Sequence, residues 1–143
     1  MKVYIASSWK NRLAVELLTD RMRDHGIMVT SFVEAEGQTI DKYSNFEDWF
    51  LSEDAQAVFS FDTEAIKNAD LIVYVGPSGT DTWFELGMAY ALFKPIIGIW
   101  VKGEMTGLMR KSLMVWTYNA NDLLKAIRVF KEVLDSKKIV SNT

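Results

Sequence analysis

Short apolar runs alternate with segments of helical periodicity along most of the chain. The apolar runs, which predict strands, cover residues 3–6, 27–32, 71–75, 96–101 and 113–116. Between and after them, apolar side chains recur at helical spacing in residues 13–25, 46–68, 83–93 and 122–134. Strands that alternate with helices in this order predict a doubly wound α/β domain, in which about five parallel strands are flanked by helices.

The same pattern predicts the character of individual segments. Residues 83–93 are apolar nearly all round, which is typical of a helix that is buried on every side. Residues 33–45 are polar and acidic and predict a long loop, of a length usually retained for function. We expect a single domain over residues 1–135 and a polar C-terminal tail over residues 136–143.

The predicted topology indicates where a ligand would bind. In doubly wound sheets, ligands lie beyond the carboxyl ends of the strands. Residues 7–12, 76–82 and 101–107 follow three of the predicted strands. We therefore expect a binding site among these three loops.

The composition narrows the classes of partner. The 143 residues carry 19 acidic and 16 basic side chains, which gives a net charge of −3. This balance disfavours a nucleic acid polymer as a partner, because binding its phosphates requires a basic face. No run reaches the roughly 18 apolar residues that a membrane span needs, and the start of the chain lacks the pattern of a signal peptide. We therefore expect no membrane partner.

The chain contains no cysteine and a single histidine. A zinc site or a histidine-based catalytic triad would therefore have few of its usual side chains to draw on. We expect neither a metal nor another cofactor. The absence of cysteine also fits a reducing compartment, and we predict a cytoplasmic protein.

Glu85 has two interpretations. It is the only charged side chain between Trp83 and Phe93, in the first turn of the predicted buried helix. In the first interpretation, Glu85 completes a capping box with Thr82, three residues earlier. In the second, it is a nucleophile or general base beside a small ligand at the edge of the sheet. Spacing alone favours the capping box.

Asp62 is predicted to lie near Glu85. Its helix ends just before the strand at residues 71–75, so the helix runs antiparallel to that strand. About 12 Å of helix separates Asp62 from Asp70, and the strand climbs about 16 Å in the opposite sense. Both carboxylates should therefore meet at one cleft, an arrangement that is used to cleave glycosidic bonds. Taken alone, Asp62 is explained at least as well without a catalytic role, as a surface acid or as an acid near a helix N-terminus.

Several motifs occur in an order that resembles a known enzyme family. They are Val-Tyr-Ile-Ala-Ser-Ser at residues 3–8, Asp62, Ala69-Asp70 before a strand, Phe-Glu-Leu-Gly-Met-Ala-Tyr-Ala-Leu at residues 84–92, and Lys-Pro-Ile-Ile at residues 94–97. Over residues 2–101 the chain resembles the nucleoside 2-deoxyribosyltransferase family, which includes the related deoxynucleoside 5'-monophosphate N-glycosidases. The resemblance implies a flavodoxin- or Rossmann-like sheet of five parallel strands. It also implies a homo-oligomer, a dimer or larger, whose subunits share active sites.

The resemblance further implies roles for particular residues. Glu85 corresponds to a nucleophile that attacks C1' of the sugar and forms a covalent intermediate, and Asp62 to an acid that helps the base to leave. Tyr4 corresponds to an aromatic residue that lines the site near the nucleophile. The positions implied to hold the substrate are Ser7, Ser8, Trp9, Lys10, Gly79 and Asp81. The implied reaction cleaves the N-glycosidic bond of a 2'-deoxynucleoside or its 5'-monophosphate with retention, and passes the deoxyribosyl group to another base or to water.

This chemistry sets an expectation for ionisation. Glu85 must be ionised in order to attack. Asp62 must instead deliver or share a proton with the base. The environment of Asp62 should therefore favour the protonated form more than the environment of Glu85 does.

Two questions stay open, and the first is whether the substrate carries a 5'-hydroxyl group or a 5'-phosphate group. Members of the family place an acid or a serine at the position of Gly79, according to whether they use nucleosides or monophosphates. Lys10 and Arg12 would favour a 5'-phosphate, whereas Asp81 would oppose one by its charge. Two other functions also stay open, a non-catalytic module that binds or senses a nucleotide and a glycohydrolase of NAD or a related ribonucleotide signal.

Overall fold

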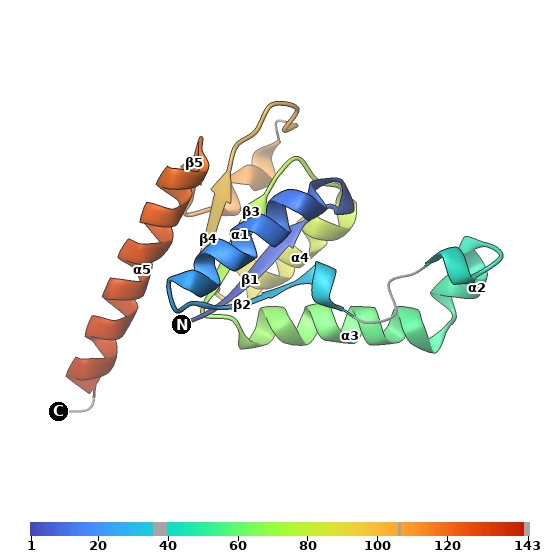
Figure 1. The fold of residues 1–143 in the computed structure, drawn as a ribbon, viewed down its shortest axis with the longest axis horizontal. Coiled ribbons are helices and arrows are strands. Elements are labelled where there is room, and N and C mark those ends of the chain that lie inside the picture. Colours follow the sequence, from blue (N-terminus) through green and yellow to red (C-terminus); the bar gives the residue numbers. More distant parts are fainter. Residues whose placement is uncertain (36–39, 106, 142–143) are drawn as a thin grey trace.

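The computed structural model describes residues 1–35, 40–105 and 107–141 (Figure 1). Its five strands form one sheet in the order β2-β1-β3-β4-β5, and every neighbouring pair is parallel. The strands are β1 (Lys2–Ser7), β2 (Met28–Ser31), β3 (Leu71–Val75), β4 (Ile96–Ile99) and β5 (Val115–Thr117). The predicted parallel α/β architecture is therefore confirmed.

Helices cover both faces of this sheet (Figure 1). They are α1 (Arg12–Asp24), α2 (Phe46–Phe50), α3 (Glu53–Asn68), α4 (Thr80–Ala91) and α5 (Ala120–Ser141). One apolar core joins the sheet to α1 and α5 and includes Val15 and Ile127. A second core joins the opposite face to α3 and α4 and includes Ile66 and Leu86. Because both faces are covered, all five residues of β3 are buried, as their continuous apolar run predicts.

Helix α2 stands apart from the sheet. It adjoins the amino-terminal end of α3, which extends past the body of the molecule in Figure 1. Asn45 and Ser52 begin α2 and α3, each by accepting a hydrogen bond from a backbone amide in the first turn. Phe46 and Phe50 of α2 are 61% and 63% exposed. This projecting end of the molecule therefore presents aromatic side chains to solvent.

Helix α4 differs from its prediction in two ways. It begins at Thr80, three residues earlier than expected, with Gly79 as its N-cap residue. Thr82 is therefore buried inside the helix, and the predicted capping box with Glu85 is wrong. The expectation that this helix is buried on every side is also wrong, because Phe84 is 65% exposed. Helix α4 lies on the outside of the sheet, so only the face that carries Leu86 packs against it.

The bounds of other elements also differ from their predictions. Helix α5 continues through Ser141, so the tail predicted at residues 136–143 is helical as far as that residue. No glycine or proline interrupts residues 120–141, and nothing in this segment therefore stops the helix. The long loop predicted at residues 33–45 includes short 3-10 helices at Phe32–Glu34 and Ile40–Lys42, and its residues 36–39 lie outside the described residues.

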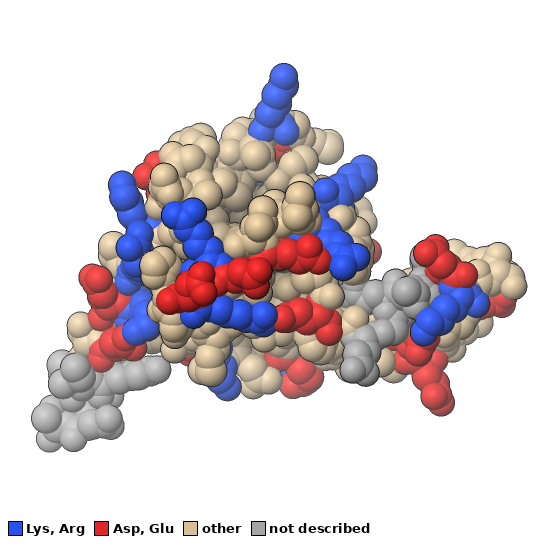
Figure 2. Space-filling view, in the orientation of Figure 1, with Lys and Arg blue, Asp and Glu red and all other residues tan. Residues whose placement is uncertain are grey.

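Charges of both signs are interspersed on the surface. Figure 2 shows Lys and Arg side chains next to Asp and Glu side chains over the body of the molecule and over its projecting end. This mixture is what the near balance of acidic and basic residues predicts. Within the described ranges, no helix is both long enough and apolar enough to cross a membrane.

Candidate active site

A cavity of about 350 Å³ opens at the carboxyl edge of the sheet, next to the ends of β1, β2 and β3. Its walls come from the segments that follow these strands and from α3 and α4, which is where a doubly wound sheet is expected to bind a ligand. The lining residues are Ser7, Ser8, Trp9, Phe32, Trp49, Val58, Asp62, Gly79, Thr80, Asp81, Thr82 and Glu85.

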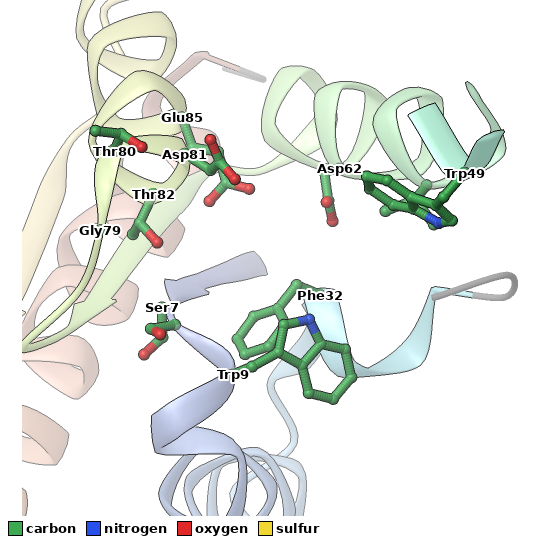
Figure 3. A pocket seen from close by; sticks show the side chains of 12 residues that line it. Ser7, Trp9, Phe32, Trp49, Asp62, Gly79, Thr80, Asp81, Thr82 and Glu85 are labelled. Atoms are coloured by element: carbon green, nitrogen blue, oxygen red, sulfur yellow. The ribbon is translucent and has the colours of Figure 1, made fainter. Parts of the chain in front are cut away.

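The cavity has an acidic wall and an aromatic wall. In Figure 3, Asp62, Asp81 and Glu85 point into the cavity from α3 and α4, and Trp9 and Phe32 lie across from them. The rings of Trp9 and Phe32 pack edge to face with their centroids 5.2 Å apart. Aromatic rings offer a surface for a planar heterocycle, and carboxylates accept hydrogen bonds from sugar hydroxyls. The arrangement therefore suits a ligand with one planar apolar part and one hydroxylated part.

Asp62 and Glu85 meet at the hydroxyl group of Tyr4. This hydroxyl donates a hydrogen bond to Asp62 Oδ1 over 2.9 Å and lies 3.2 Å from Glu85 Oε1. Tyr4 is fully buried in β1 and belongs to the core between the sheet and helices α3 and α4. Two carboxylates from two helices are thus held by one side chain of the sheet. The predicted meeting of Asp62 and Glu85 at one cleft is confirmed.

The single proton of the Tyr4 hydroxyl cannot form hydrogen bonds to Asp62 and Glu85 at the same time. Burial raises the pKa of Tyr4 far above its usual range, and the nearby carboxylates Glu85 and Asp62 raise it further, so the hydroxyl keeps its single proton. That proton can point to only one carboxylate at a time. The other contact becomes favourable when its carboxyl group is protonated and donates to the tyrosine oxygen. The geometry therefore calls for one additional proton shared between Asp62 and Glu85.

The environment of the two carboxylates assigns this proton to Glu85. Burial raises the pKa of Glu85 to about 8, with further increases from the nearby charges of Asp62 and Asp81 and a partial offset by the Tyr4 hydrogen bond. Burial also raises the pKa of Asp62, to about 6, against the lowering effect of its hydrogen bond from Tyr4. The expectation that Asp62 holds a proton more strongly than Glu85 is therefore wrong. Glu85 is the more affected because it faces two other acids in a buried position.

Other features of Glu85 point to the cavity. Its Oε2 atom is buried and has no hydrogen-bond partner among the described residues. An unpartnered carboxylate oxygen of this kind is costly in the resting protein and is common where a group acts on a ligand. Within the described part of the chain, no group of three or more His, Cys, Asp or Glu side chains is placed to hold a metal ion.

Asn11 joins the segments that follow β1 and β3, both of which contribute lining residues to the cavity. Its Nδ2 atom lies 3.0 Å from Ser7 Oγ, 3.3 Å from the carbonyl oxygen of Val75 and 2.9 Å from that of Pro77, and donates to these acceptors. The Ser7 hydroxyl in turn donates to the Val75 carbonyl over 2.5 Å. Ser7 thus supports the loop after β3 in addition to lining the cavity. Nothing in the sequence singled out Asn11, because an asparagine after a strand is common in any loop.

The structure gathers most of the predicted site residues but leaves out Lys10. Seven of them line the cavity, namely Ser7, Ser8, Trp9, Asp62, Gly79, Asp81 and Glu85. Lys10 is exposed on the short 3-10 helix Trp9–Asn11 and is not among the lining residues. Arg12 is not among the lining residues either; its Nε atom pairs with Glu16 over 2.7 Å, and its guanidinium group lies 5.6 Å from the ring of the lining residue Trp9.

Several lining residues were not predicted as substrate contacts. Phe32 follows β2, and the sheet order that places β2 beside β1 brings it to the cavity. Trp49 reaches the cavity from the projecting helix α2. Thr80 and Thr82 lie in the first turn of α4, within residues 76–82, which were expected to contribute to the site without these two side chains being named. Strand order was the missing information for Phe32, because its segment was not among the three loops expected to form the site. The expectation for the loop at residues 101–107 is wrong, since none of its described residues lines the cavity.

A second cavity, of about 610 Å³, adjoins the first. It lies among α2, α3 and α4 and shares Trp49, Val58, Asp62, Asp81 and Glu85 with the first cavity. Its remaining lining is mostly apolar, with Phe46, Phe50, Phe59, Phe84, Ile66 and Met88 among its members. The two carboxylates that contact Tyr4 therefore line both cavities.

Comparison with solved structures yields several likenesses. A scan against protein-family models finds no match, and a search of curated proteins finds none either. The chain is similar to a 2-deoxyribosyltransferase from the bacterium Bacillus psychrosaccharolyticus, with 29% identity and a TM-score of 0.65 over 86% of this chain and 90% of that one. It is also similar to the CMP N-glycosidase BcmB of Clostridium botulinum, with 18% identity and a TM-score of 0.59 over 90% and 99% of the two chains. A conserved protein from Enterococcus faecalis V583 has 17% identity and a TM-score of 0.63 over 90% and 97%.

The last two likenesses show the fold alone, because their sequence identities are low. The first combines the fold with a higher identity over most of both chains. The motifs at residues 3–8 and 84–92 contribute Tyr4 and Glu85 to the site described above. The resemblance inferred from the sequence is thereby confirmed, because the chain is similar to a 2-deoxyribosyltransferase both in its fold and in its sequence.

Proposed function

We propose that the protein is a cytoplasmic enzyme that cleaves the N-glycosidic bond of a 2'-deoxynucleoside or of its 5'-monophosphate. The observation that carries this proposal is the contact of Asp62 and Glu85 with one buried hydroxyl group, at the edge of a cavity with an aromatic wall. The aromatic wall suits the base, and the acidic wall suits the sugar. A substrate bound in this way would have the bond between base and sugar close to the two carboxylates.

In the first step, a carboxylate oxygen of Glu85 attacks C1' of the sugar. The bond between C1' and the base nitrogen breaks, and its electron pair leaves with the base. Asp62 delivers a proton to the departing base, so that the base leaves as a neutral molecule. The sugar stays attached to Glu85 as a covalent glycosyl ester.

In the second step, another base or a water molecule attacks C1' from the side that the first base left. The bond to Glu85 breaks and its electron pair returns to the carboxylate. Asp62, now ionised, accepts the proton of the attacking group. Two displacements at C1' retain the configuration of the sugar. A base as the attacking group gives transfer, and water gives hydrolysis.

The distance between the carboxylates supports retention. Asp62 Oδ1 and Glu85 Oε1 are 2.9 and 3.2 Å from one tyrosine oxygen, so these two atoms lie no more than about 6 Å apart. Retaining glycosidases hold their carboxyl groups about 5 to 5.5 Å apart, whereas inverting enzymes need about 6.5 to 9.5 Å to admit a water molecule. The pair is therefore close enough for direct attack by one member.

Tyr4 supplies a route for the shared proton. The resting site holds that proton on Glu85, whereas the reaction needs it on Asp62. When Glu85 donates to the tyrosine oxygen and the tyrosine donates to Asp62, a shift of both protons moves one net proton between the two acids. No proton needs to leave the buried site. This transfer converts the resting form into the reactive form.

The cavity favours a 5'-hydroxyl group over a 5'-phosphate. Its lining holds Asp62, Asp81 and Glu85, and none of its described lining residues is Lys or Arg. A phosphate would bring negative charge next to these acids, whereas a hydroxyl can donate a hydrogen bond to one of them. Asp81, in the first turn of α4, is the acid that remains for this purpose. We therefore expect nucleosides to be better substrates than their monophosphates.

The enzyme acts as a homo-oligomer in this proposal, with sites shared between subunits as the family resemblance implies. Phe84, Tyr90 and Phe93 of α4 and its C-terminal end are 65%, 63% and 95% exposed. Phe84 also lines the second cavity, and large exposed apolar side chains are common at protein contacts. Light scattering should give a mass of two or more chains, and Phe84→Glu should lower that mass.

The function is tested by chromatography of base release. The purified protein is incubated with deoxynucleosides, ribonucleosides and their 5'-monophosphates, each with and without a second free base. We expect release of the base from deoxynucleosides and loss of at least about 10³-fold of this rate in Glu85→Gln, because the nucleophile is removed. Glu64→Gln is the matched control, since Glu64 is an exposed acid of α3 that pairs with Lys67.

Each outcome of this assay decides between named functions. Equal rates for wild type and Glu85→Gln would refute the role of Glu85. Binding of nucleotides without any base release would identify a non-catalytic sensing module. Preference for ribose over deoxyribose would identify a ribonucleotide glycohydrolase, and preference for monophosphates would refute the role of the acidic wall.

A further inference from the structure

A second buried polar cluster lies on the same face of the sheet as the active site. Its members are Tyr74, Ser78, Trp83, Glu104 and Arg110, and we call it the Glu104 cluster. None of these side chains is among those that line the candidate active site. The cluster connects the end of β3, the first turns of α4 and the segment between β4 and β5.

Glu104 is the centre of this cluster. Its side chain is only 1% exposed, and both of its carboxylate oxygens have donors. The Tyr74 hydroxyl donates to Oε2 over 2.6 Å, and Arg110 Nη2 donates to Oε1 over 3.0 Å. Ser78 Oγ donates to the Tyr74 hydroxyl over 3.0 Å. The buried carboxylate is therefore paired and hydrogen-bonded at each oxygen.

Arg110 extends the cluster to α4. The carbon of its guanidinium group lies 3.9 Å from the centroid of the Trp83 ring, a close cation–π contact. The Trp83 ring also packs against the ring of Tyr74, with the centroids 5.1 Å apart. The backbone carbonyl of Arg110 accepts a hydrogen bond from Trp116 Nε1 over 3.2 Å. Trp83 thus packs between Arg110, which is paired with Glu104, and Tyr74, which belongs to β3.

Two glycines leave space for these contacts. A Cβ atom at Gly76 would overlap Glu104 Oε2, and it would approach the Tyr74 hydroxyl to 2.9 Å. A Cβ atom at Gly107 would lie 2.9 Å from Arg110 Nη1. A larger residue at either position would therefore require the ion-pair side chains to shift. The backbone around the ion pair is fitted closely to it.

A buried ion pair needs an explanation other than stability. Removing two charges from water costs about as much as their attraction returns, and apolar residues of similar volume often stabilise a protein as well. An ion pair with a planar guanidinium group instead fixes direction, because its hydrogen bonds and its stacking surface are geometrically strict. The contacts of the Glu104 cluster converge on Trp83, two residues before Glu85.

The helix geometry relates Trp83 to the catalytic acids. At 3.6 residues per turn, residues two apart point to nearly opposite sides of a helix, and residues four apart point to nearly the same side. Trp83 therefore faces away from Glu85, whereas Asp81 and Glu85 face the same way. The contacts of Arg110 and Tyr74 with Trp83, on the side of α4 away from Glu85, therefore restrict rotation of the helix about its axis. That rotation sets where the two acids point.

We propose that Glu104 and Arg110 are positioning residues, which act through Trp83 to hold the first turns of α4 with Asp81 and Glu85 directed into the cavity. This inference rests on the proposed function of Glu85. The aromatic wall of the cavity comes from other elements, through Trp9 and Phe32. A disturbed Glu104 cluster should therefore impair the chemical step more than the binding of the base.

The test uses two variants that avoid an unpaired buried charge. Arg110→Lys keeps the charge beside Glu104 but removes the planar group above Trp83. The double variant Glu104→Gln and Arg110→Met removes both charges together. Thr117→Val is the matched control, because it deletes a buried hydrogen bond to the carbonyl of Gly98 in the same sheet without touching the cluster.

We expect kcat for base release to fall about tenfold to a hundredfold in both variants, with little change in KM, because small displacements of a reacting group have effects of this size. Hydrogen exchange of the segment at residues 79–88 should become faster in both variants and stay unchanged in Thr117→Val. Unchanged kcat together with unchanged exchange would overturn the proposal. An equal effect of Thr117→Val on kcat would also overturn it, because a general loss of stability would then suffice.

The exchange measurement separates this proposal from the proposed function. If no substrate is cleaved by the wild type, the function fails, and faster exchange at residues 79–88 still supports the hold on α4. If the wild type is active through Glu85 and the variants match it in rate and exchange, only the positioning role fails.

Discussion

Two tyrosines on neighbouring strands stand at the centres of two polar clusters that differ in charge balance. Tyr4 in β1 and Tyr74 in β3 are both fully buried on the same face of the sheet, and each donates a hydrogen bond to a carboxylate. Beside Tyr74, the carboxylate of Glu104 is paired with Arg110. Beside Tyr4, two carboxylates share one hydroxyl, and no ion pair of the described residues includes either of them.

The difference shows how one scaffold separates a structural cluster from a reactive one. In the cluster around Tyr74, a cation neutralises the buried carboxylate, and each oxygen of Glu104 accepts a hydrogen bond. In the cluster around Tyr4, burial raises the pKa of Asp62 to about 6 and that of Glu85 to about 8. A proton is therefore held near neutral pH, where it can take part in catalysis. Missing charge compensation, and not burial alone, distinguishes the active site.

The largest effect should come from removing the uncompensated acid. In wild type, the folded protein keeps a proton on Glu85 up to about pH 8, whereas the unfolded chain releases it near pH 4.5. The folded state therefore binds more protons in this window, and stability decreases as pH rises through it. Glu85→Gln has no ionisable group at this position, so it does not lose this stability. The free energy of unfolding of Glu85→Gln minus that of wild type should therefore rise by on the order of 4 kcal/mol between pH 5 and pH 9, measured by urea unfolding.

Glu104→Gln gives the matched change in the balanced cluster. It leaves Arg110 without its charged partner, so the unfolding free energy should fall by about 3 kcal/mol at both pH values. An advantage of Glu85→Gln that does not change with pH would show that Glu85 is not protonated in the folded protein. The comparison between the two clusters would then lose its basis.

The next largest effect should come from removing each tyrosine hydroxyl. Asp62 and Glu85 titrate as a pair, so the pH profile of kcat/KM should be bell-shaped with limbs near 6 and 8. Burial raises both pKa values, and the hydrogen bonds from Tyr4 partly offset this. Tyr4→Phe should therefore move both limbs to higher pH and lower kcat at pH 7 by about 10²-fold, since it also interrupts proton transfer.

Tyr74→Phe is the control for that substitution. It removes a donor from Glu104 and should cost about 1 to 2 kcal/mol of stability, measured by thermal unfolding. The limbs of its pH profile should stay in place, because Tyr74 contacts neither Asp62 nor Glu85. A shift of the limbs in Tyr74→Phe equal to that in Tyr4→Phe would contradict the separation of the two clusters.

The parts of the fold that could be predicted from the sequence are those in which apolar residues recur in a regular pattern. The apolar runs at residues 3–6 and 71–75 lie within β1 and β3, and the distances along α3 and β3 placed Asp62 beside Glu85. Such positions follow from rise per residue and from the direction of each element. They require no knowledge of side-chain packing.

Features that depend on tertiary packing were missed. Both Gly79 and Thr82 are acceptable N-cap residues, and only the structure decides between them. Glu104 and Arg110 lie in a segment without periodicity, so nothing in the sequence indicates that they are buried together. The order of the pKa values of Asp62 and Glu85 depends on burial and on Asp81, and it was predicted in reverse.

The smallest effect should come from giving the active site the cation that it lacks. Val58 lines the cavity four residues before Asp62 on α3, so the side chain of Val58→Lys can reach the carboxylates. A positive charge within about 4 to 6 Å favours the ionised forms, and both limbs of the pH profile should move to lower pH by about one unit.

Ala57→Lys is the control, because it adds the same charge at an exposed neighbouring position that does not line the cavity. At 0.15 M salt, an exposed charge is screened beyond about 8 Å, so Ala57→Lys should leave the limbs in place. Equal shifts in the two variants would indicate a general effect of net charge, and no shift in Val58→Lys would show that lack of a cation does not set these pKa values.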